Sequence, residues 1–121
     1  MPDELTERII GAAVEVHRHL GPGLLESIYE EALTHELGLR QIDCERQVAV
    51  EVLYKDIRIH GQRLDRLVEN EVVVEIKSMK AVPGVASAQV LSYLNATGLK
   101  RALLINFSET KLVNGIKRFS L

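Results

Sequence analysis

The sequence lacks the features that mark secreted and membrane proteins. Cys44 is the only cysteine among 121 residues, so an intrachain disulfide is impossible and a reducing compartment such as the cytoplasm is expected. No apolar run approaches the roughly 18 residues that a membrane-spanning helix needs. The acidic, amphipathic start MPDELTERII does not resemble a signal peptide. We therefore expect a cytoplasmic protein without a membrane partner.

The chain also lacks a strong charge of either sign. Its formal net charge is −2, so no basic field indicates a nucleic-acid partner and none excludes one. Hydrophobic residues make up 46% of the chain and charged residues 26%, which is ordinary for a soluble globular protein. Because neither repeats nor linker-like stretches interrupt the sequence, residues 1–121 are expected to form a single domain with one core.

Two helices are predicted at the start of the chain. Apolar residues recur at helical spacing from Leu5 to Leu20, with Asp3 as a plausible N-cap. Gly11 inside this helix costs about 1 kcal/mol relative to alanine, so close packing is expected there. The GPG at 21–23 separates it from a second helix that Gly38 is expected to end. The apolar side of that second helix is expected to contain Leu24, Leu25, Ile28, Tyr29, Ala32, Leu33 and Leu37.

The hydrophobic period then changes to two, which indicates strands. The first strand covers Val48 to Tyr54, and a tight turn at Lys55–Asp56 leads into Ile57 and Ile59. Further strands are expected at 62–68, 71–77 and 101–107, with a helix at 85–97 that Gly98 ends and a short segment at the C-terminus. A strand, helix and parallel strand form a right-handed βαβ unit. The fold class is therefore α/β, or more specifically an α+β mixed sheet flanked by helices.

The stretch VVVEIKS at 72–78 places two charges at the end of a buried strand. Glu75 and Lys77 share one face, because strand residues two apart point the same way. Either the strand reaches the sheet edge and its end is solvated, or the charges form a site. The acid-x-lysine spacing is weak evidence, since chance gives about one occurrence in such a chain. A second copy indeed occurs at Glu109 and Lys111.

Asp65 distinguishes the first copy from the second, because it is an acid on the strand that precedes Glu75 and Lys77. If the hairpin loop has three residues, Val68 faces Val72 and Asp65 faces Glu75, whereas a two-residue turn would place Asp65 opposite Val74. Carboxylates opposed in this way lie roughly 5 Å apart at Cβ and repel each other unless a cation lies between them. Oxygen ligands at a strand pair suit Mg²⁺. Lys77 could then position or deprotonate a water, or offset phosphate charge.

Three other polar residues have two interpretations each. Gln89 and Tyr93 share a helix face at spacing i, i+4 and lie downstream of Lys77, so they could turn toward the site. Alternatively, Gln89 bonds locally and Tyr93 belongs to the core. Glu26 lies at the edge of an apolar stripe, where a carboxylate can reach a cleft. It is equally typical of a solvated first-turn acid that the helix dipole favours.

Taken together, these residues resemble a known family. Asp65, Glu75-x-Lys77, Gln89-xxx-Tyr93 and Glu26 are similar to the motifs of the PD-(D/E)xK nuclease superfamily, and Gln-xxx-Tyr is similar to its RecB-like exonuclease branch. GLLESIY at 23–29 resembles the signature of the small bacterial GxxExxY proteins. The resemblance covers nearly the whole chain. The family often has a histidine before its AQ, where this chain has residues 85–87, VAS.

The resemblance implies a restriction-endonuclease-like core of order α-β-β-β-α-β. It also implies a Mg²⁺ or Mn²⁺ site at Asp65 and Glu75, with the Ile76 carbonyl as a further ligand and Glu26 assisting. Gln89 and Tyr93 would lie near nucleic acid. The expected function is a Mg²⁺-dependent nuclease-type phosphodiesterase acting on DNA. The alternative is a non-catalytic nucleic-acid- or protein-binding module on a nuclease scaffold, and a homodimer or protein partner is possible in both cases. Candidate phosphate contacts are Arg46, Arg63, Arg66, Lys77 and Lys80.

Overall fold

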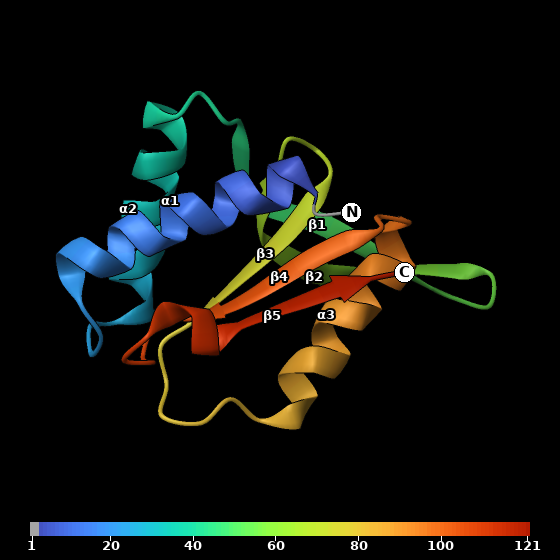
Figure 1. Cartoon of the computed structure of the whole chain (residues 1–121). Coiled ribbons are helices and arrows are strands. Elements are labelled where there is room, and N and C mark those ends of the chain that lie inside the picture. Colours follow the sequence, from blue (N-terminus) through green and yellow to red (C-terminus); the bar gives the residue numbers. More distant parts are fainter. Residues whose placement is uncertain (1–2) are drawn as a thin grey trace.

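A computed structural model describes residues 3–121 as a mixed sheet between helices (Figure 1). The elements in chain order are α1 (Glu4–Leu20), α2 (Glu26–Leu39), β1 (Cys44–Tyr54), β2 (Ile57–Val68), β3 (Val72–Lys77), α3 (Gly84–Thr97), β4 (Arg101–Asn106), the 3₁₀ turn η1 (Leu112–Gly115) and β5 (Ile116–Ser120). The strands lie in the order β1-β2-β3-β4-β5. Among the strands of residues 3–121, β3 and β4 are the one parallel pair, which confirms the predicted βαβ unit.

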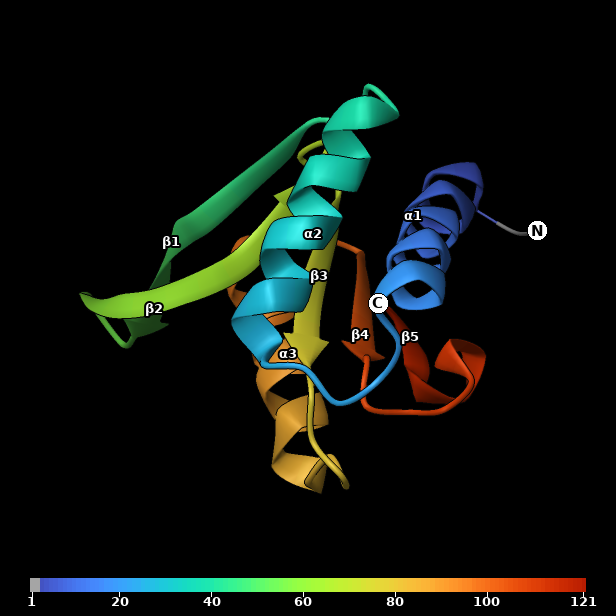
Figure 2. The same ribbon diagram turned by 90° about the vertical axis from the view of Figure 1, so that its left-hand side faces the viewer.

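Helices cover both faces of the sheet, so β3 at its centre is buried on both sides (Figures 1 and 2). Val72, Val74 and Ile76 pack into a core with α1 and α2. Val73 packs into a second core beneath α3. The alternation of strand side chains therefore assigns Glu75, two residues after Val73, to the α3 side of the sheet.

Several predicted helix ends are confirmed and one is wrong. The Asp3 carboxylate accepts a hydrogen bond from Leu5 N at 3.1 Å and caps α1, and Gly98 ends α3 with a left-handed φ of 77°. Gly38 does not end α2, because the helix continues to Leu39 and Arg40 is its C-cap. The apolar side of α2 is also narrower than predicted. Leu24 and Leu25 precede the helix and are exposed, as is Ile28, and the buried residues of α2 are Tyr29, Leu33 and Leu37.

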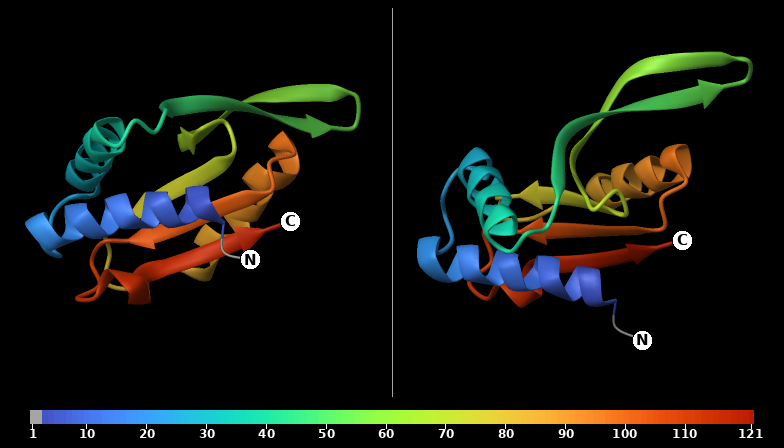
Figure 3. Two further views of the ribbon diagram at one scale, coloured as in Figure 1. Left: turned by 45° about the horizontal axis from the view of Figure 1, so that its top comes forward. Right: turned by 90° about the horizontal axis from the view of Figure 1, so that it is seen from above.

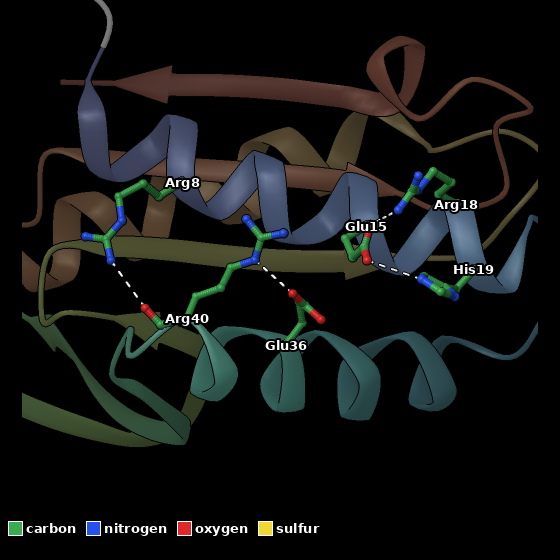
Figure 4. Close-up of polar contacts among 6 residues, drawn as sticks. All are labelled: Arg8, Glu15, Arg18, His19, Glu36 and Arg40. Carbon is green, nitrogen blue, oxygen red and sulfur yellow. Dashed lines mark hydrogen bonds and ion pairs between the residues drawn. The ribbon is translucent and has the colours of Figure 1, made fainter.

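At Gly11, where close packing is predicted, the structure has only an ordinary contact. The Arg40 side chain at the end of α2 lies against α1 (Figure 4), and a Cβ at position 11 would lie 3.4 Å from its Nη1. Arg40 Nε donates to Glu36 Oε2 at 2.8 Å, and Arg8 Nη2 donates to the Arg40 carbonyl at 3.5 Å. The Arg40 side chain thus links the end of α2 to α1 next to Gly11, and the space there does not require a glycine.

The strands differ from the prediction at their ends. β1 begins at Cys44, before the predicted Val48, and β2 runs without interruption from Ile57 to Val68. The C-terminal segment contains a fifth strand, β5, which pairs with β4. Its weak alternation and mostly exposed side chains left little signal in the sequence. The expected core order is nevertheless present as α2-β1-β2-β3-α3-β4.

The outer part of the β1–β2 hairpin, residues 51–61, projects from the rest of the molecule as an arm (Figures 2 and 3). Val52 pairs with Ile59 and Tyr54 with Ile57. These four side chains lie on one face of the arm and are exposed. Among residues 3–121, the helices do not combine the length and apolarity that a membrane crossing requires.

Candidate active site

The hairpin between β2 and β3 has the register on which the predicted site depends. Val68 pairs with Val72 and Arg66 with Val74, and the loop consists of residues 69–71. Glu69 and Asn70 adopt left-handed conformations with φ of 53° and 57°, which allow the tight reversal. The three-residue loop is therefore confirmed, and the same register continued by one pair brings Asp65 opposite Glu75.

At Asp65 the backbone of β2 twists, so that the side chains before and after this residue lie on opposite faces of the sheet. Leu64 packs on the α3 side, whereas Arg66, two residues later, donates through Nε to Thr34 Oγ1 of α2 at 2.9 Å. Residues two apart in a regular strand share a face, so the backbone twists between them. The ladder with β3 also ends at the Arg66–Val74 pair. Asp65 therefore lies where the two layers meet and can contact side chains from both faces.

Arg66, which alternates with Asp65 along β2, is a candidate phosphate contact that the structure buries. Its side chain is 1% exposed and Nη1 donates to the Asp65 carbonyl at 2.8 Å, so it cannot contact a phosphate. Instead it fixes the turn of β2 against α2. The other candidate phosphate contacts, Arg46, Arg63 and Lys80, are exposed.

Glu75 is buried beside Asp65. The residue is 3% exposed, and its Oε1 has no hydrogen-bond partner among the described residues. Burial and then the Asp65 carboxylate raise the pKa of Glu75 to about 8, and the Lys77 charge opposes this shift. The interpretation of a solvated strand end is therefore wrong for Glu75. Lys77 is partly buried at the end of β3.

Glu26 and Glu30 approach the same place from α2. One carboxylate oxygen each from Glu26, Glu30 and Asp65 lie within 4.8 Å of one another. Burial raises the pKa of Glu26, Lys77 lowers it, and Glu30 and Asp65 raise it further. Lys77 is therefore near enough to lower the pKa of both Glu26 and Glu75. The sequence analysis missed Glu30, although its spacing of four residues from Glu26 puts both on one helix face.

The segment GLLESIY fixes the position of Glu26. The Tyr29 hydroxyl donates to the Gly21 carbonyl and accepts from Leu24 N at 3.1 Å. Its ring stacks on Phe107, which follows β4, with centroids 4.5 Å apart. Ser78 Oγ, directly after β3, donates to the Leu24 carbonyl at 2.6 Å. The start of α2 is thereby joined to the ends of both parallel strands.

Tyr93 borders the site, whereas Gln89 lies on the surface. Burial raises the pKa of Tyr93, and the Glu75 and Asp65 carboxylates raise it further. The Gln62 side chain of β2 lowers the pKa of Tyr93 and so lies near it, although the sequence motifs did not include Gln62. Gln89 is exposed one turn earlier on α3. Ile76 is buried, with its side chain in the core beneath α1 and α2.

The donor set suits a hard divalent cation. The cluster contains carboxylate oxygens from Glu26, Glu30, Asp65 and Glu75, which are the ligands that Mg²⁺ and Ca²⁺ prefer. Without a cation, the repulsion between Asp65 and Glu75 is offset only in part by Lys77. The buried oxygen of Glu75 that lacks a partner would gain a ligand if a cation were bound. These residues therefore fit a divalent metal ion.

Comparisons with known proteins agree with this geometry. A family model described as the PD-(D/E)XK nuclease superfamily matches residues 3–119. No curated protein and no solved structure gave a significant match. Nucleases of this superfamily generally use divalent metal ions, in keeping with the carboxylate cluster at Asp65. Because the match spans nearly the whole chain and the mixed sheet fits that core, this protein belongs to the PD-(D/E)XK nuclease superfamily and has a nuclease-like fold and function.

Proposed function

We propose that this protein is a Mg²⁺-dependent phosphodiesterase of nuclease type that acts on DNA. The observation that carries the proposal is the buried, partnerless Oε1 of Glu75 next to Asp65, with Lys77 adjoining both acidic groups of the site. Burying a carboxylate beside another carboxylate is unfavourable. Such an arrangement is expected where a cation and a phosphate are bound, rather than where stability alone is selected.

Each residue has a defined role in this proposal. Asp65 and Glu75 would hold Mg²⁺ or Mn²⁺ together with the Ile76 carbonyl, and Glu26 would assist. The bound ion would supply positive charge to the phosphate and acidify a water. The Lys77 amine would orient the attacking water or take its proton, because a positioned base near the reacting water lowers the barrier to proton transfer.

Binding of nucleic acid is expected to be weak for a monomer. Gln89 and Tyr93 are proposed to lie next to the strand, with Arg46, Arg63 and Lys80 as phosphate contacts. These are few for a chain of net charge −2, since affinity for DNA comes largely from neutralised phosphates. A homodimer or a protein partner would extend the contact surface.

The finer assignments follow from the sequence motifs. We propose that the chain is a bacterial GxxExxY protein, with residues 1–121 as one nuclease-like domain in the cytoplasm. The contacts of Tyr29 and the position of Glu26 support a structural reason for that motif, since both residues fix α2 against the site. The lone Cys44 agrees with a reducing compartment.

The proposal is tested by cleavage assays with single- and double-stranded DNA and RNA, in linear and circular forms, with Mg²⁺, Mn²⁺ or EDTA. Wild type is expected to cleave DNA only with a divalent ion, and Glu75→Ala is expected to lose at least about 100-fold of this activity. Cleavage in EDTA, or equal activity in Glu75→Ala, would contradict the proposed site. Preference for RNA would contradict the DNA assignment alone.

The apolar face of the arm favours a second candidate, a module that binds protein. Tyr54 and Ile57 are 57% and 58% exposed, and exposed apolar patches mark interaction surfaces. A second copy of the chain is the simplest partner to test. Light scattering should then show a dimer in wild type and a monomer in Tyr54→Ser with Ile57→Ser. A dimer combined with no cleavage of any nucleic acid would favour this candidate.

A further inference from the structure

We propose that Glu30 is a direct ligand of a divalent cation, in a site that it forms with Glu26 and Asp65. This inference rests on the proposed function, because it concerns metal binding at the same site. It adds a residue that the sequence motifs did not include. It also means that α2 contributes metal ligands in addition to packing against the sheet.

The geometry of the three carboxylates carries the first step. Glu26 and Glu30 lie one turn apart on α2, and their oxygens lie with one of Asp65 inside a span of 4.8 Å. A cation equidistant from three oxygens at that limit is about 2.8 Å from each, slightly beyond the 2.3–2.6 Å range for Ca²⁺ and further beyond the 2.0–2.1 Å of Mg²⁺. The side chains therefore need only a small closure to bind either ion.

A second observation is independent of this cluster. Glu75 is almost fully buried, its Oε1 has no partner among the described residues, and it lies close enough to Asp65 for that carboxylate to raise its pKa. Asp65 thus adjoins Glu75 on the α3 side and Glu26 with Glu30 on the α2 side. Three carboxylates around that of Asp65 are unfavourable unless positive charge lies among them. Lys77 supplies part of that charge to Glu26 and Glu75.

Two other glutamates, one on α1 and one on α2, form ion pairs with arginines. Glu15 pairs with Arg18 at 2.6 Å, and Glu36 pairs with Arg40 at 2.8 Å (Figure 4). Among residues 3–121, no ion pair involves Glu30. Its nearest charged neighbours in the cluster are two further carboxylates, so a structural ion pair does not explain its position.

The test is calorimetric titration of the full chain with Mn²⁺, for wild type, Glu30→Gln and Glu31→Gln. Glu31 is the matched control, because it is the next residue on α2 and is exposed. Glu30→Gln is expected to weaken Mn²⁺ binding by at least about 10-fold, since even residues behind the ligands cost 10–100-fold in metal affinity. Glu31→Gln should bind Mn²⁺ within about 2-fold of wild type. The Mn²⁺-induced rise in Tm should shrink in Glu30→Gln in parallel.

Wild-type Mn²⁺ affinity in folded Glu30→Gln would overturn the inference and leave Asp65 and Glu75 as the metal ligands. If Glu30→Gln does not fold by circular dichroism, Glu30→Asp keeps the charge but shortens the side chain, and unchanged Mn²⁺ affinity there would equally overturn it. Mn²⁺ affinity that depends on Glu30 without cleavage of nucleic acid would support the inference and refute the nuclease proposal. Cleavage with affinity independent of Glu30 would refute the inference alone.

Discussion

The chain contains the acid-x-lysine spacing twice, and the two copies lie in different surroundings. Glu75 and Lys77 end the central strand β3, where Glu75 is buried beside Asp65. Glu109 and Lys111 lie in the loop between β4 and η1, where Glu109 is partly buried and Lys111 is exposed. The Glu109 carbonyl accepts from His17 Nε2 at 2.8 Å, so this residue contributes its backbone rather than its carboxylate.

The comparison teaches that the spacing carries no chemistry by itself. The first copy ends one buried parallel strand and the second comes shortly after the other, so both are close to the carboxyl ends of these strands. Only Glu75 has a second acid brought to it by the turn of a neighbouring strand. Glu75 and Lys77 therefore belong to a cluster of interacting charges, as expected for an active site. Glu109 and Lys111 serve as matched controls for substitutions of Glu75 and Lys77.

The largest difference is expected in catalysis. Lys77→Ala should reduce nucleic-acid cleavage by about 100-fold or more, because the amine is proposed to position or deprotonate the attacking water. Lys111→Ala should remain within about 2-fold of wild type. Steady-state cleavage rates at saturating Mg²⁺ measure both. Equal rates for the two variants would remove Lys77 from the reaction.

A smaller difference is expected in stability and its pH dependence. The raised pKa of Glu75, about 8 against an ordinary 4.5, means that the folded protein holds a proton that the unfolded chain releases. Metal-free wild type should therefore lose stability as the pH rises from about 4.5 to 8. Glu75→Gln should remove this loss and gain about 1–3 kcal/mol near pH 8, whereas Glu109→Gln should follow wild type.

Urea unfolding in EDTA at pH 5, 6.5 and 8 measures these stabilities. If Glu75→Gln lost several kcal/mol instead, Glu75 would be a structural ion-pair partner of Lys77, and the assignment of the carboxylate to a metal site would be wrong.

The smallest difference is expected at the serines that follow the two strands. Ser78→Ala removes the hydrogen bond from Oγ to the Leu24 carbonyl and should cost about 0.5–1.5 kcal/mol. Ser108 comes shortly after β4 and makes its contact through the backbone, because Ser108 N donates to Asn106 Oδ1 at 3.2 Å. Ser108→Ala should therefore change stability by less than about 0.5 kcal/mol. Thermal unfolding measures the stability of both variants. A larger loss of stability in Ser108→Ala than in Ser78→Ala would contradict the structural role given to the Ser78 hydroxyl.

Much of the fold could be predicted from local signals. Asp3 and Gly98 mark helix ends through capping and a left-handed backbone, and both act at short range. The register of the β2–β3 hairpin could be predicted because a loop of three residues fixes which side chains face each other. The βαβ unit followed from the order of its elements and a general rule of handedness.

The parts that could not be predicted depend on long-range packing. Arg66 is buried because β2 twists at Asp65, and simple alternation contains no sign of that twist. Glu30 joins the site because α2 packs on the face of the sheet that contains β3, which the sequence of α2 does not reveal. The exposed face of the arm, with Tyr54 and Ile57, has the same alternation as a buried strand.

The turn of β2 at Asp65 has a consequence for how this protein can vary between lineages. Residues 51–61 lie beyond the last buried pair of the hairpin, so their number can change without moving the carboxylate. A change of two residues in each strand keeps every remaining side chain on its face, and exposed loop tips tolerate insertion. Homologous chains should therefore differ in arm length in even steps while the segment from Leu64 to Lys77 keeps its length.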